Sequence, residues 1–264
     1  MNEQQYKFKW IEQAANADST YDMSVIGGRL ASNLSQVFSA GYQGALRHVF
    51  PEIRYQGWSA LAVSEDRSEE NPLPGLTAHI AEHGYRLKGH KTWVAACDVL
   101  DSMIVRARLE NDMEATGDDR SESTSQLFHI ALPTQGLTLT SNPNPSLLPD
   151  LSQGRAHFDD VAAAESTVVD SAGLKNFAPC EAMHILTAFV AWVAAQAPSL
   201  GSEATPLLDQ ARRLLNEESL PEQAQRNEFS AAVQGLATQF GSACDSEAVN
   251  FQRDRRLIAM YAPR

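Results

Sequence analysis

The stretch 84–101, GYRLKGHKTWVAACDVLD, places an aromatic side chain at the end of a candidate strand. Apolar and basic residues alternate over 85–88, which is typical of a hairpin arm with one buried face. Trp93 follows, and residues 94–96 are Val-Ala-Ala, which offer no side-chain hydrogen bond. An indole at a strand end can contact a planar ligand, and it can equally pack beneath a helix. Trp93 is therefore a candidate binding residue with both interpretations open.

Two other groups of residues have types that could bind a ligand. His79 and His83 are four residues apart, but they fall on a predicted hairpin, where this spacing does not converge on a metal ion. The arginines of 253–256 could meet a phosphate, although a charged helix face is the commoner explanation. Three cysteines, at 97, 180 and 244, are too far apart in sequence to indicate a zinc site. We predict no metal site.

Composition restricts the partners and the location of the chain. Its 264 residues can bury a substantial core, and the formal charge of −12 disfavours nucleic acid and anionic membranes as partners. The longest apolar run, 185–195, is too short to span a bilayer. The first ten residues have no apolar region of a secretory signal, and the odd, scattered cysteines indicate reduced thiols. We expect a cytoplasmic protein without a membrane span.

The spacing of apolar residues, which indicates the helices and strands that position these side chains, changes twice along the chain. Residues 1–54 have helical spacing, with one long helix predicted over 23–49, and residues 173–264 are helical again. That last part should contain an apolar helix over 180–196, a break at 198–206, a short helix over 207–218 and a helical tail. Residues 55–172 alternate with period two, and an acidic surface loop is predicted at 110–125. The predicted strands are 76–82, 85–89, 102–108, 126–132, 137–141 and 154–158, with a turn at 83–84 between the first two.

This order predicts an α+β multi-layer fold: a short N-terminal helical segment, a middle β-barrel-like domain and a C-terminal helical bundle. Three stretches within it resemble the acyl-CoA dehydrogenases. Residues 60–108 resemble the family's T-E-P-x-x-G-S-D loop, hairpin and K-x-W-I-T strand end. Residues 154–169, GRAHFDDVAAAESTVV, resemble its closing strand, F-x-D-V-x-V-P. Residues 253–264, RDRRLIAMYAPR, resemble its R-D-x-x-x-x-x-I-Y-E-G-T terminus. The chain is similar to a divergent, shortened member of that family.

The resemblance implies a flavoenzyme that oxidises an acyl-CoA thioester with FAD. In that family a glutamate removes the α-proton of the thioester and the β-hydrogen leaves as hydride to the flavin. The family's flavin-binding positions correspond here to Ser64 in the loop and to Trp93 and Ala95 at the strand end.

The sequence departs from the family where this chemistry would occur. The loop 64–71 has lost its glycine and gained acids, and Ala95 replaces a hydroxyl residue. Ala262 stands at the usual position of the catalytic glutamate, and the family's arginine-bearing helix motif has no counterpart after Gln196. We therefore expect FAD to bind weakly or not at all.

Some members of the family place the base earlier, on the first helix of the C-terminal domain. Glu181, within Pro179–His184, falls near that place at the start of an apolar stretch. A carboxylate there could be desolvated, which would raise its pKa toward that of a working base. The alternative is a helix N-terminal acid that complements the helix dipole.

Three functions follow from the resemblance and remain open. The chain could be a flavin-dependent acyl-CoA dehydrogenase that uses Glu181. It could be an inactive homologue that acts as a scaffold or silent partner of an active acyl-CoA dehydrogenase. It could also bind acyl-CoA without flavin, and a ligand of this kind would raise the melting temperature. We expect a homo- or hetero-oligomer, because the helix face with Ile185, Phe189 and Trp192 would need to be covered.

Overall fold

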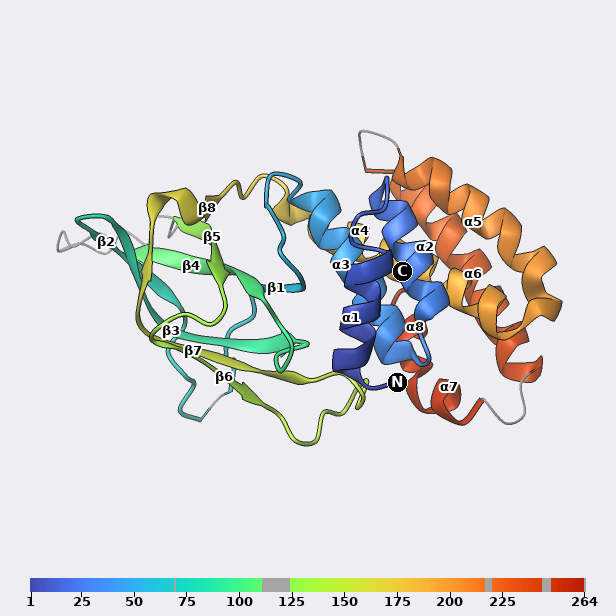
Figure 1. Ribbon diagram of the computed structural model, residues 1–264, viewed down its shortest axis with the longest axis horizontal. Coiled ribbons are helices and arrows are strands. Elements are labelled where there is room, and N and C mark those ends of the chain that lie inside the picture. Colours follow the sequence, from blue (N-terminus) through green and yellow to red (C-terminus); the bar gives the residue numbers. More distant parts are fainter. Residues whose placement is uncertain (69, 111–123, 217–219, 244–247, 264) are drawn as a thin grey trace. The chain divides into compact units, whose positions relative to one another are not determined.

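The computed structural model describes residues 1–68, 70–110, 124–216, 220–243 and 248–263, so the loop predicted at 110–125 lies almost wholly outside the described residues (Figure 1). The chain divides into two compact units. The helical unit comprises residues 1–51, 144–151 and 173–264, and the β unit comprises residues 52–143 and 152–172. The predicted order of helices, then a sheet, then helices is confirmed.

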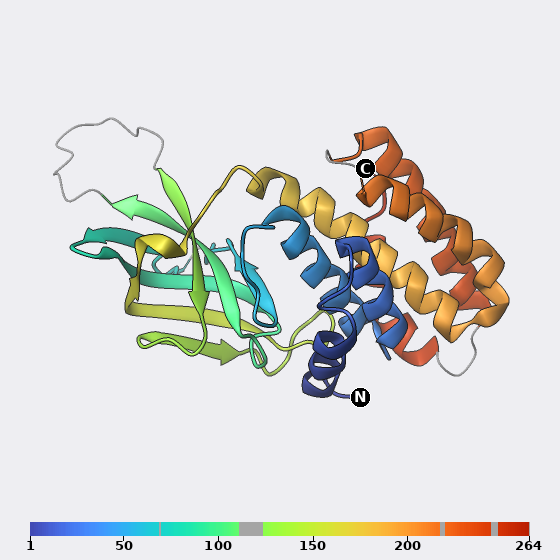
Figure 2. The same cartoon turned by 45° about the horizontal axis from the view of Figure 1, so that its top comes forward.

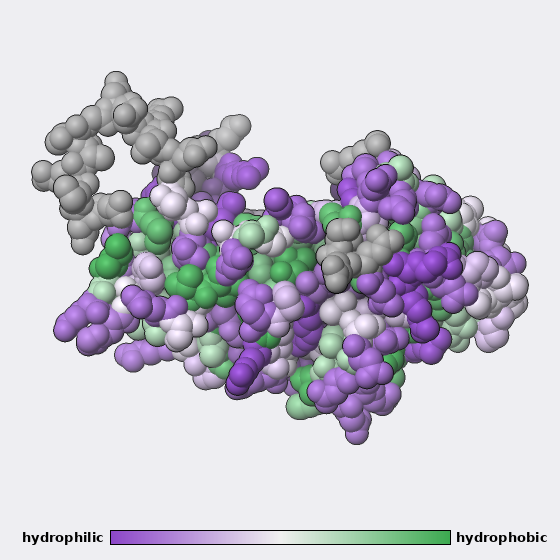
Figure 3. All heavy atoms as spheres, turned by 90° about the horizontal axis from the view of Figure 1, so that it is seen from above, coloured by the Kyte–Doolittle hydropathy of each residue, from purple (hydrophilic) through white to green (hydrophobic). Residues whose placement is uncertain are grey.

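The helical unit is built from both ends of the chain. Its helices are α1 (Glu3–Gln13), α2 (Thr20–Leu30), α3 (Leu34–Val49), α4 (Leu174–Gln196), α5 (Gly201–Leu215), α6 (Gln223–Ala243), α7 (Ala248–Asp254) and α8 (Arg256–Ala259), with 3₁₀ turn η2 (Pro198–Leu200) before α5. Figure 3 shows mostly hydrophilic side chains over the visible surface of these helices.

Several helix boundaries in this unit differ from the prediction; α4, for example, begins at Leu174 rather than at residue 180. The single helix predicted over 23–49 is wrong, because Ala31 is extended and Asn33 caps a new helix, its side chain accepting a hydrogen bond from the Gln36 amide at 3.0 Å. The break predicted over 198–206 is also too long. Helix α5 already begins at Gly201 and continues through Pro206, which lies near its N-terminus and removes one backbone hydrogen bond.

Helix α4 is the core of the helical unit. It contacts α2, α3, α5 and α6, and it starts at Leu174 and runs through Pro179. Among the described residues it is the one helix long and apolar enough to cross a membrane, but 72% of its apolar window is buried inside the structure. That burial is typical of the core helix of a globular unit.

The apolar face predicted to need a partner is already covered within the chain. Ile185, Phe189 and Trp192 are all buried. The Phe240 ring lies 4.9 Å from that of Trp192, and the Phe251 ring lies 6.1 Å from that of Phe189. The stated reason for an oligomer is therefore wrong, and oligomerisation itself stays a prediction.

Two glycines allow the neighbouring helices to approach α4 closely. A Cβ atom on Gly28 of α2 would lie 2.2 Å from the Ala188 carbonyl oxygen, and one on Gly41 of α3 would lie 2.4 Å from the Ile185 Cα. Both obstacles are backbone atoms of α4, which cannot move aside as a flexible side chain can. The positions of α2 and α3 therefore depend on the absence of a side chain at these two residues.

Gly28→Ala should lower the free energy of unfolding by about 1–3 kcal/mol or more, because the added methyl group overpacks the contact between α2 and α4. The matched control is Gly235→Ala in α6, where a Cβ would meet nothing within 4 Å. That change should stabilise by about 0.5–1 kcal/mol through helix propensity. Urea denaturation of both variants measures the difference, and equal effects would contradict close packing at Gly28.

The β unit is one mixed, curved sheet (Figure 2). Its strands are β1 (Ser59–Ala62), β2 (Thr77–Ala81), β3 (Gly84–Ala95), β4 (Ser102–Glu110), β5 (Ser125–Ala131), β6 (Leu137–Ser141), β7 (Gln153–Ala163) and β8 (Val168–Val169), and a 3₁₀ turn, η1 (Glu165–Thr167), precedes β8. The order is β6-β7-β3-β2-β4-β5-β8, with β1 on β4. The β1–β4 and β2–β4 pairs are parallel and the others antiparallel.

The hairpin of β2 and β3 turns one residue earlier than predicted. Ala81 pairs with Gly84, so the turn is Glu82-His83 rather than 83–84. Gly84 has φ of 117°, and its Cβ would lie 2.4 Å from the Ala163 carbonyl oxygen of the neighbouring strand. A glycine is required here for both reasons, and strand β3 then extends to Ala95, well beyond its predicted end.

Candidate functional site

A β-bulge near the end of β3 turns Trp93 outward. The register of β3 against β7 shifts between Lys91 and Val94, which leaves Thr92 and Trp93 inside the bulge. Lys91 and Val94 are fully buried, whereas Trp93 is 44% exposed and has φ of 55°. Positive φ is uncommon for a bulky residue, and such conformations cluster at functional sites. The bulge thus presents an indole ring on the surface of the β unit.

An ion pair between Lys91 and Glu65 holds the preceding loop against this strand. The Lys91 side chain is fully buried, and its Nζ lies 2.6 Å from Glu65 Oε1. The same Glu65 oxygen accepts the Leu76 amide at 3.3 Å, and the Thr92 amide donates to the Ser64 carbonyl at 2.9 Å. The loop and the strand end that carry the family resemblance are therefore joined directly.

Burial and the interaction between the two groups shift the pKa values of Lys91 and Glu65. Burial lowers the pKa of Lys91, and the hydrogen bond and charge of Glu65 oppose that effect. Partial burial acts to raise the pKa of Glu65, but the hydrogen bond and charge of Lys91, the Leu76 amide and the charge of Arg106 together outweigh it, so the pKa of Glu65 is lowered. Each group therefore favours the charged form of the other.

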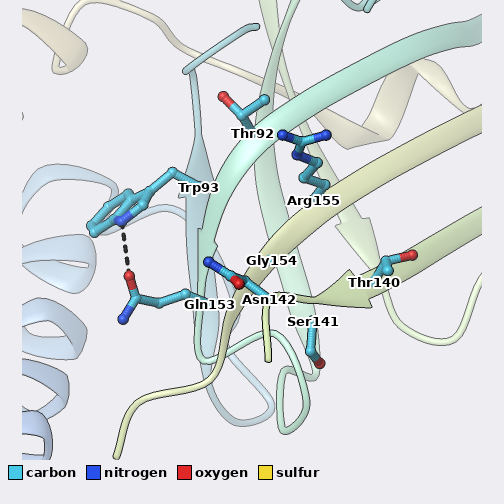
Figure 4. A pocket seen from close by; sticks show the side chains of 8 residues that line it. All are labelled: Thr92, Trp93, Thr140, Ser141, Asn142, Gln153, Gly154 and Arg155. Atoms are coloured by element: carbon cyan, nitrogen blue, oxygen red, sulfur yellow. Dashed lines mark hydrogen bonds between the residues drawn. The ribbon is translucent and has the colours of Figure 1, made fainter. Parts of the chain in front are cut away.

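The bulge borders a pocket of about 470 Å³ in the β unit (Figure 4). Its walls come from the ends of β3, β6 and β7, and it is lined by Thr92, Trp93, Thr140, Ser141, Asn142, Gln153, Gly154 and Arg155. The Trp93 indole N–H donates to Gln153 Oε1 at 3.2 Å. The Arg155 side chain is exposed, and its charge acts on Asp66, so it lies near the loop that Glu65 anchors. We call this the Trp93 pocket.

Of the three predicted flavin-binding residues, only Trp93 lines the pocket. Ala95 is 2% exposed and pairs with Gln153 in the β3–β7 ladder, and Ser64 contributes its backbone carbonyl to the anchored loop. Thr92 and Arg155 line the pocket but were missed by the sequence analysis. Thr92 supplies a hydroxyl one residue before Trp93, and only the bulge, which the alternation of residues does not reveal, brings it into the pocket.

The side chains of the pocket fit a flavin. An exposed indole can stack on a planar ring, threonine and serine hydroxyls can bond polar ring atoms, and a guanidinium binds phosphate well. Within the described part of the chain, no group of three or more His, Cys, Asp or Glu side chains could hold a metal ion.

Glu181 lies in the helical unit, on α4. Helix α4 begins at Leu174 and has no acidic residue in its first turn, so Glu181 does not complement the helix dipole, and that alternative is wrong. Burial raises the pKa of Glu181 from 4.5 to about 7. By exposed area the Glu181 side chain is half-buried.

The C-terminal tail reaches the surroundings of Glu181. Burial raises the pKa of Tyr261, and the nearby Glu181 and Tyr42 raise it further. The Ser230 hydroxyl bonds the Tyr261 carbonyl, and Gln234 Nε2 donates to the Ile258 carbonyl at 2.6 Å, so α6 anchors the tail. Ala262 follows Tyr261 directly. The two positions at which the resembled family places its base therefore lie in one region of the helical unit, and only Glu181 carries a carboxylate there.

His184 and Arg253 have structural roles. His184 is fully buried, with Nδ1 2.8 Å from Ser24 Oγ and Nε2 3.2 Å from His48 Nδ1, so it is a satisfied core histidine. Arg253 bonds Asp254 and Asp150, and it thereby fastens segment 144–151 to α7. Because two carboxylates already bond its guanidinium, Arg253 is not a candidate for binding phosphate.

Known structures share this architecture at low sequence identity. The FAD complex of PigA aligns with a TM-score of 0.61 and 16% identity, covering 97% of this chain and 82% of that one. FMN-bound TdsC from Paenibacillus sp. A11-2 gives 0.63 and 12%, covering 92% and 80%. A putative acyl-CoA dehydrogenase from Mycobacterium smegmatis gives 0.55 and 15%, covering 86% and 76%. The chain has the acyl-CoA dehydrogenase-like fold. No protein-family model matches the sequence, and the search of curated proteins gave no match.

Glu181→Gln should change the pH dependence of stability. The folded chain holds a proton on Glu181 up to about pH 7, whereas the unfolded chain loses it near its ordinary pKa of about 4.3. The free energy of unfolding should therefore fall as the pH rises from about 4.5 to 7, and the glutamine variant should lack this fall. At pH 8 the variant should be more stable by about 1–3 kcal/mol, and at pH 4.5 about equal to wild type.

Urea denaturation at the two pH values measures this difference. The control is Glu228→Gln, an exposed position on α6, which should change the free energy of unfolding little at either pH. A Glu181→Gln variant with the same pH dependence as wild type would show that the carboxyl is not desolvated.

Proposed function

We propose that this chain is a flavin-dependent dehydrogenase of acyl thioesters that holds its flavin weakly. The observation that carries the proposal is the Trp93 pocket, which is lined by an exposed indole with positive φ, by hydroxyl groups and by Arg155. Several structures with this fold contain FAD or FMN, which supports a flavin as the ligand.

The proposed chemistry assigns a separate task to each residue. Bound flavin supplies the acceptor for a hydride from the β-carbon of the substrate. Trp93 provides a face for the ring, the Thr92 and Thr140 hydroxyls orient its polar atoms, and Arg155 holds a phosphate group. Glu181 accepts the α-proton, and its desolvation makes it a stronger base than a carboxylate in water.

Weak binding follows from what this pocket lacks. Ala95 offers no donor, and Ser64 does not line the pocket. Each missing hydrogen bond removes about 1–3 kcal/mol, and about 1.4 kcal/mol corresponds to a tenfold change in affinity. Two such losses weaken flavin binding by more than about tenfold.

A second candidate function is that of an inactive partner of an active homologue. Two observations favour it: the Trp93 N–H is already bonded to Gln153, and the tail position Ala262 has no carboxylate. The similar structures do not indicate one substrate. PigA was solved with FAD and proline, whereas FkbI is described as a protein for biosynthesis of a methoxymalonyl extender unit. The acyl group, a cytoplasmic location and any partner chain remain proposals for this protein.

Titration of flavin fluorescence with the protein tests the proposed site. Trp93→Ala and Arg155→Gln should each weaken binding about tenfold or more, because each removes a contact worth about 1–3 kcal/mol. The control Arg86→Gln changes an exposed arginine of β3 that pairs with Asp160 and does not line the pocket. It should leave the affinity unchanged. Absence of flavin binding at any accessible concentration, or equal affinity in all variants, contradicts the proposal.

Reduction of flavin by an acyl-CoA distinguishes the two proposed functions, enzyme and inactive partner. With flavin added in excess, wild type should reduce it when an acyl-CoA is supplied, and Glu181→Gln should not, while its flavin affinity stays the same. Flavin binding without reduction in wild type would favour the inactive partner. Reduction by the glutamine variant would place the base elsewhere.

A further inference from the structure

A second pocket of the β unit has more basic than acidic side chains among the described residues that line it. It measures about 310 Å³ and is lined by Glu65, Gly75, Leu76, Arg106, Arg108 and Ser125. It shares no lining residue with the Trp93 pocket. We propose that this pocket, which we call the arginine pocket, binds a phosphate group.

The two arginines stand on one face of β4. Residues two apart on a strand point the same way, and both side chains are exposed. Arg108 Nη2 lies 3.1 Å from Glu110 Oε1, and the other oxygen of Glu110 lies 3.3 Å from His79 Nε2. Among the described residues, no carboxylate lies within ion-pair distance of the Arg106 guanidinium. Arg106 is thus available to an anion from solvent.

A third cation lies behind this face. The Lys91 ammonium is buried against Glu65, and Arg106 is near enough that its charge opposes that of Lys91. In the described part of the chain, the three cations Lys91, Arg106 and Arg108 lie near two carboxylates, those of Glu65 and Glu110. The whole chain has a formal charge of −12, so an excess of basic side chains is a local feature of this pocket.

The lining offers donors for three ligand oxygens, which suits a phosphate group better than a carboxylate with two oxygens. An arginine fork bonds two oxygens of a tetrahedral oxyanion, and charge-assisted hydrogen bonds of this kind are about twice as strong as neutral ones. The Ser125 hydroxyl can donate to a third oxygen. The Glu65 carboxylate, which also lines the pocket, is occupied by Lys91 and the Leu76 amide, so its repulsion of the ligand is reduced.

Melting temperatures in phosphate test this inference, because a ligand of the folded state stabilises it in proportion to its occupancy. Inorganic phosphate should raise the melting temperature above that in sodium chloride of equal ionic strength, and the rise should saturate. Arg106→Gln should need at least ten times more phosphate for the same rise, and Arg106→Lys should retain part of it. Arg86→Gln, on the same sheet but outside the pocket, should respond as wild type does.

An equal response of Arg106→Gln and wild type, or no rise beyond the chloride control, would overturn the proposal. Adenosine monophosphate in a parallel titration distinguishes the source of the phosphate. Tighter binding of the ester, dependent on Arg106, assigns the site to a phosphate monoester, and equal or weaker binding assigns it to free phosphate. The result does not depend on flavin, since the titration uses the protein without added flavin and the two pockets have separate residues.

Discussion

The buried ammonium of Lys91 is the constraint on which the β unit's surface depends. A lysine with a fully buried side chain is tolerated only when a carboxylate meets it, because an unpaired charge in the interior costs several kcal/mol. Glu65 meets that need from the loop between β1 and β2. The loop must therefore lie against β3, and its backbone then receives the Thr92 amide. With Lys91 directed inward and Val94 buried, the two residues between them bulge, and Trp93 turns outward.

The helical unit has an analogous constraint, although it is made by packing. Gly28 and Gly41 let α2 and α3 touch the backbone of α4, which leaves α4 buried along most of its length. Glu181 lies before the most deeply buried part of this helix, near Tyr261 of the tail that α6 holds. The raised pKa of Glu181 is thus a consequence of how the ends of the chain assemble, and a mutation far from the carboxyl could change it.

The sequence predicted helices and strands correctly where one spacing of apolar residues dominates a segment. The alternation over 85–88 and 137–141 and the apolar run of α4 led to the right element types, and the resemblance named the fold that the structure shows. The prediction from sequence failed where a helix cap or a β-bulge interrupts this spacing. The Asn33 cap splits a helix that apolar spacing alone would continue, and the bulge at Thr92 reverses the faces of the strand. Arg155 could not be found, because its place beside Trp93 depends on pairing between β3 and β7, far apart in sequence.

The central claim is that the Lys91–Glu65 pair organises a flavin-binding surface. The most direct test compares the flavin dissociation constants of wild type and Lys91→Met by fluorescence titration. Methionine matches the buried stem of the lysine, and Glu65, whose side chain is 42% exposed, can turn toward water, so the variant should fold. The account predicts flavin binding by wild type and about tenfold weaker binding or more by Lys91→Met, since the loop is no longer anchored. Equal affinity in a folded variant, or no binding by wild type, would contradict it.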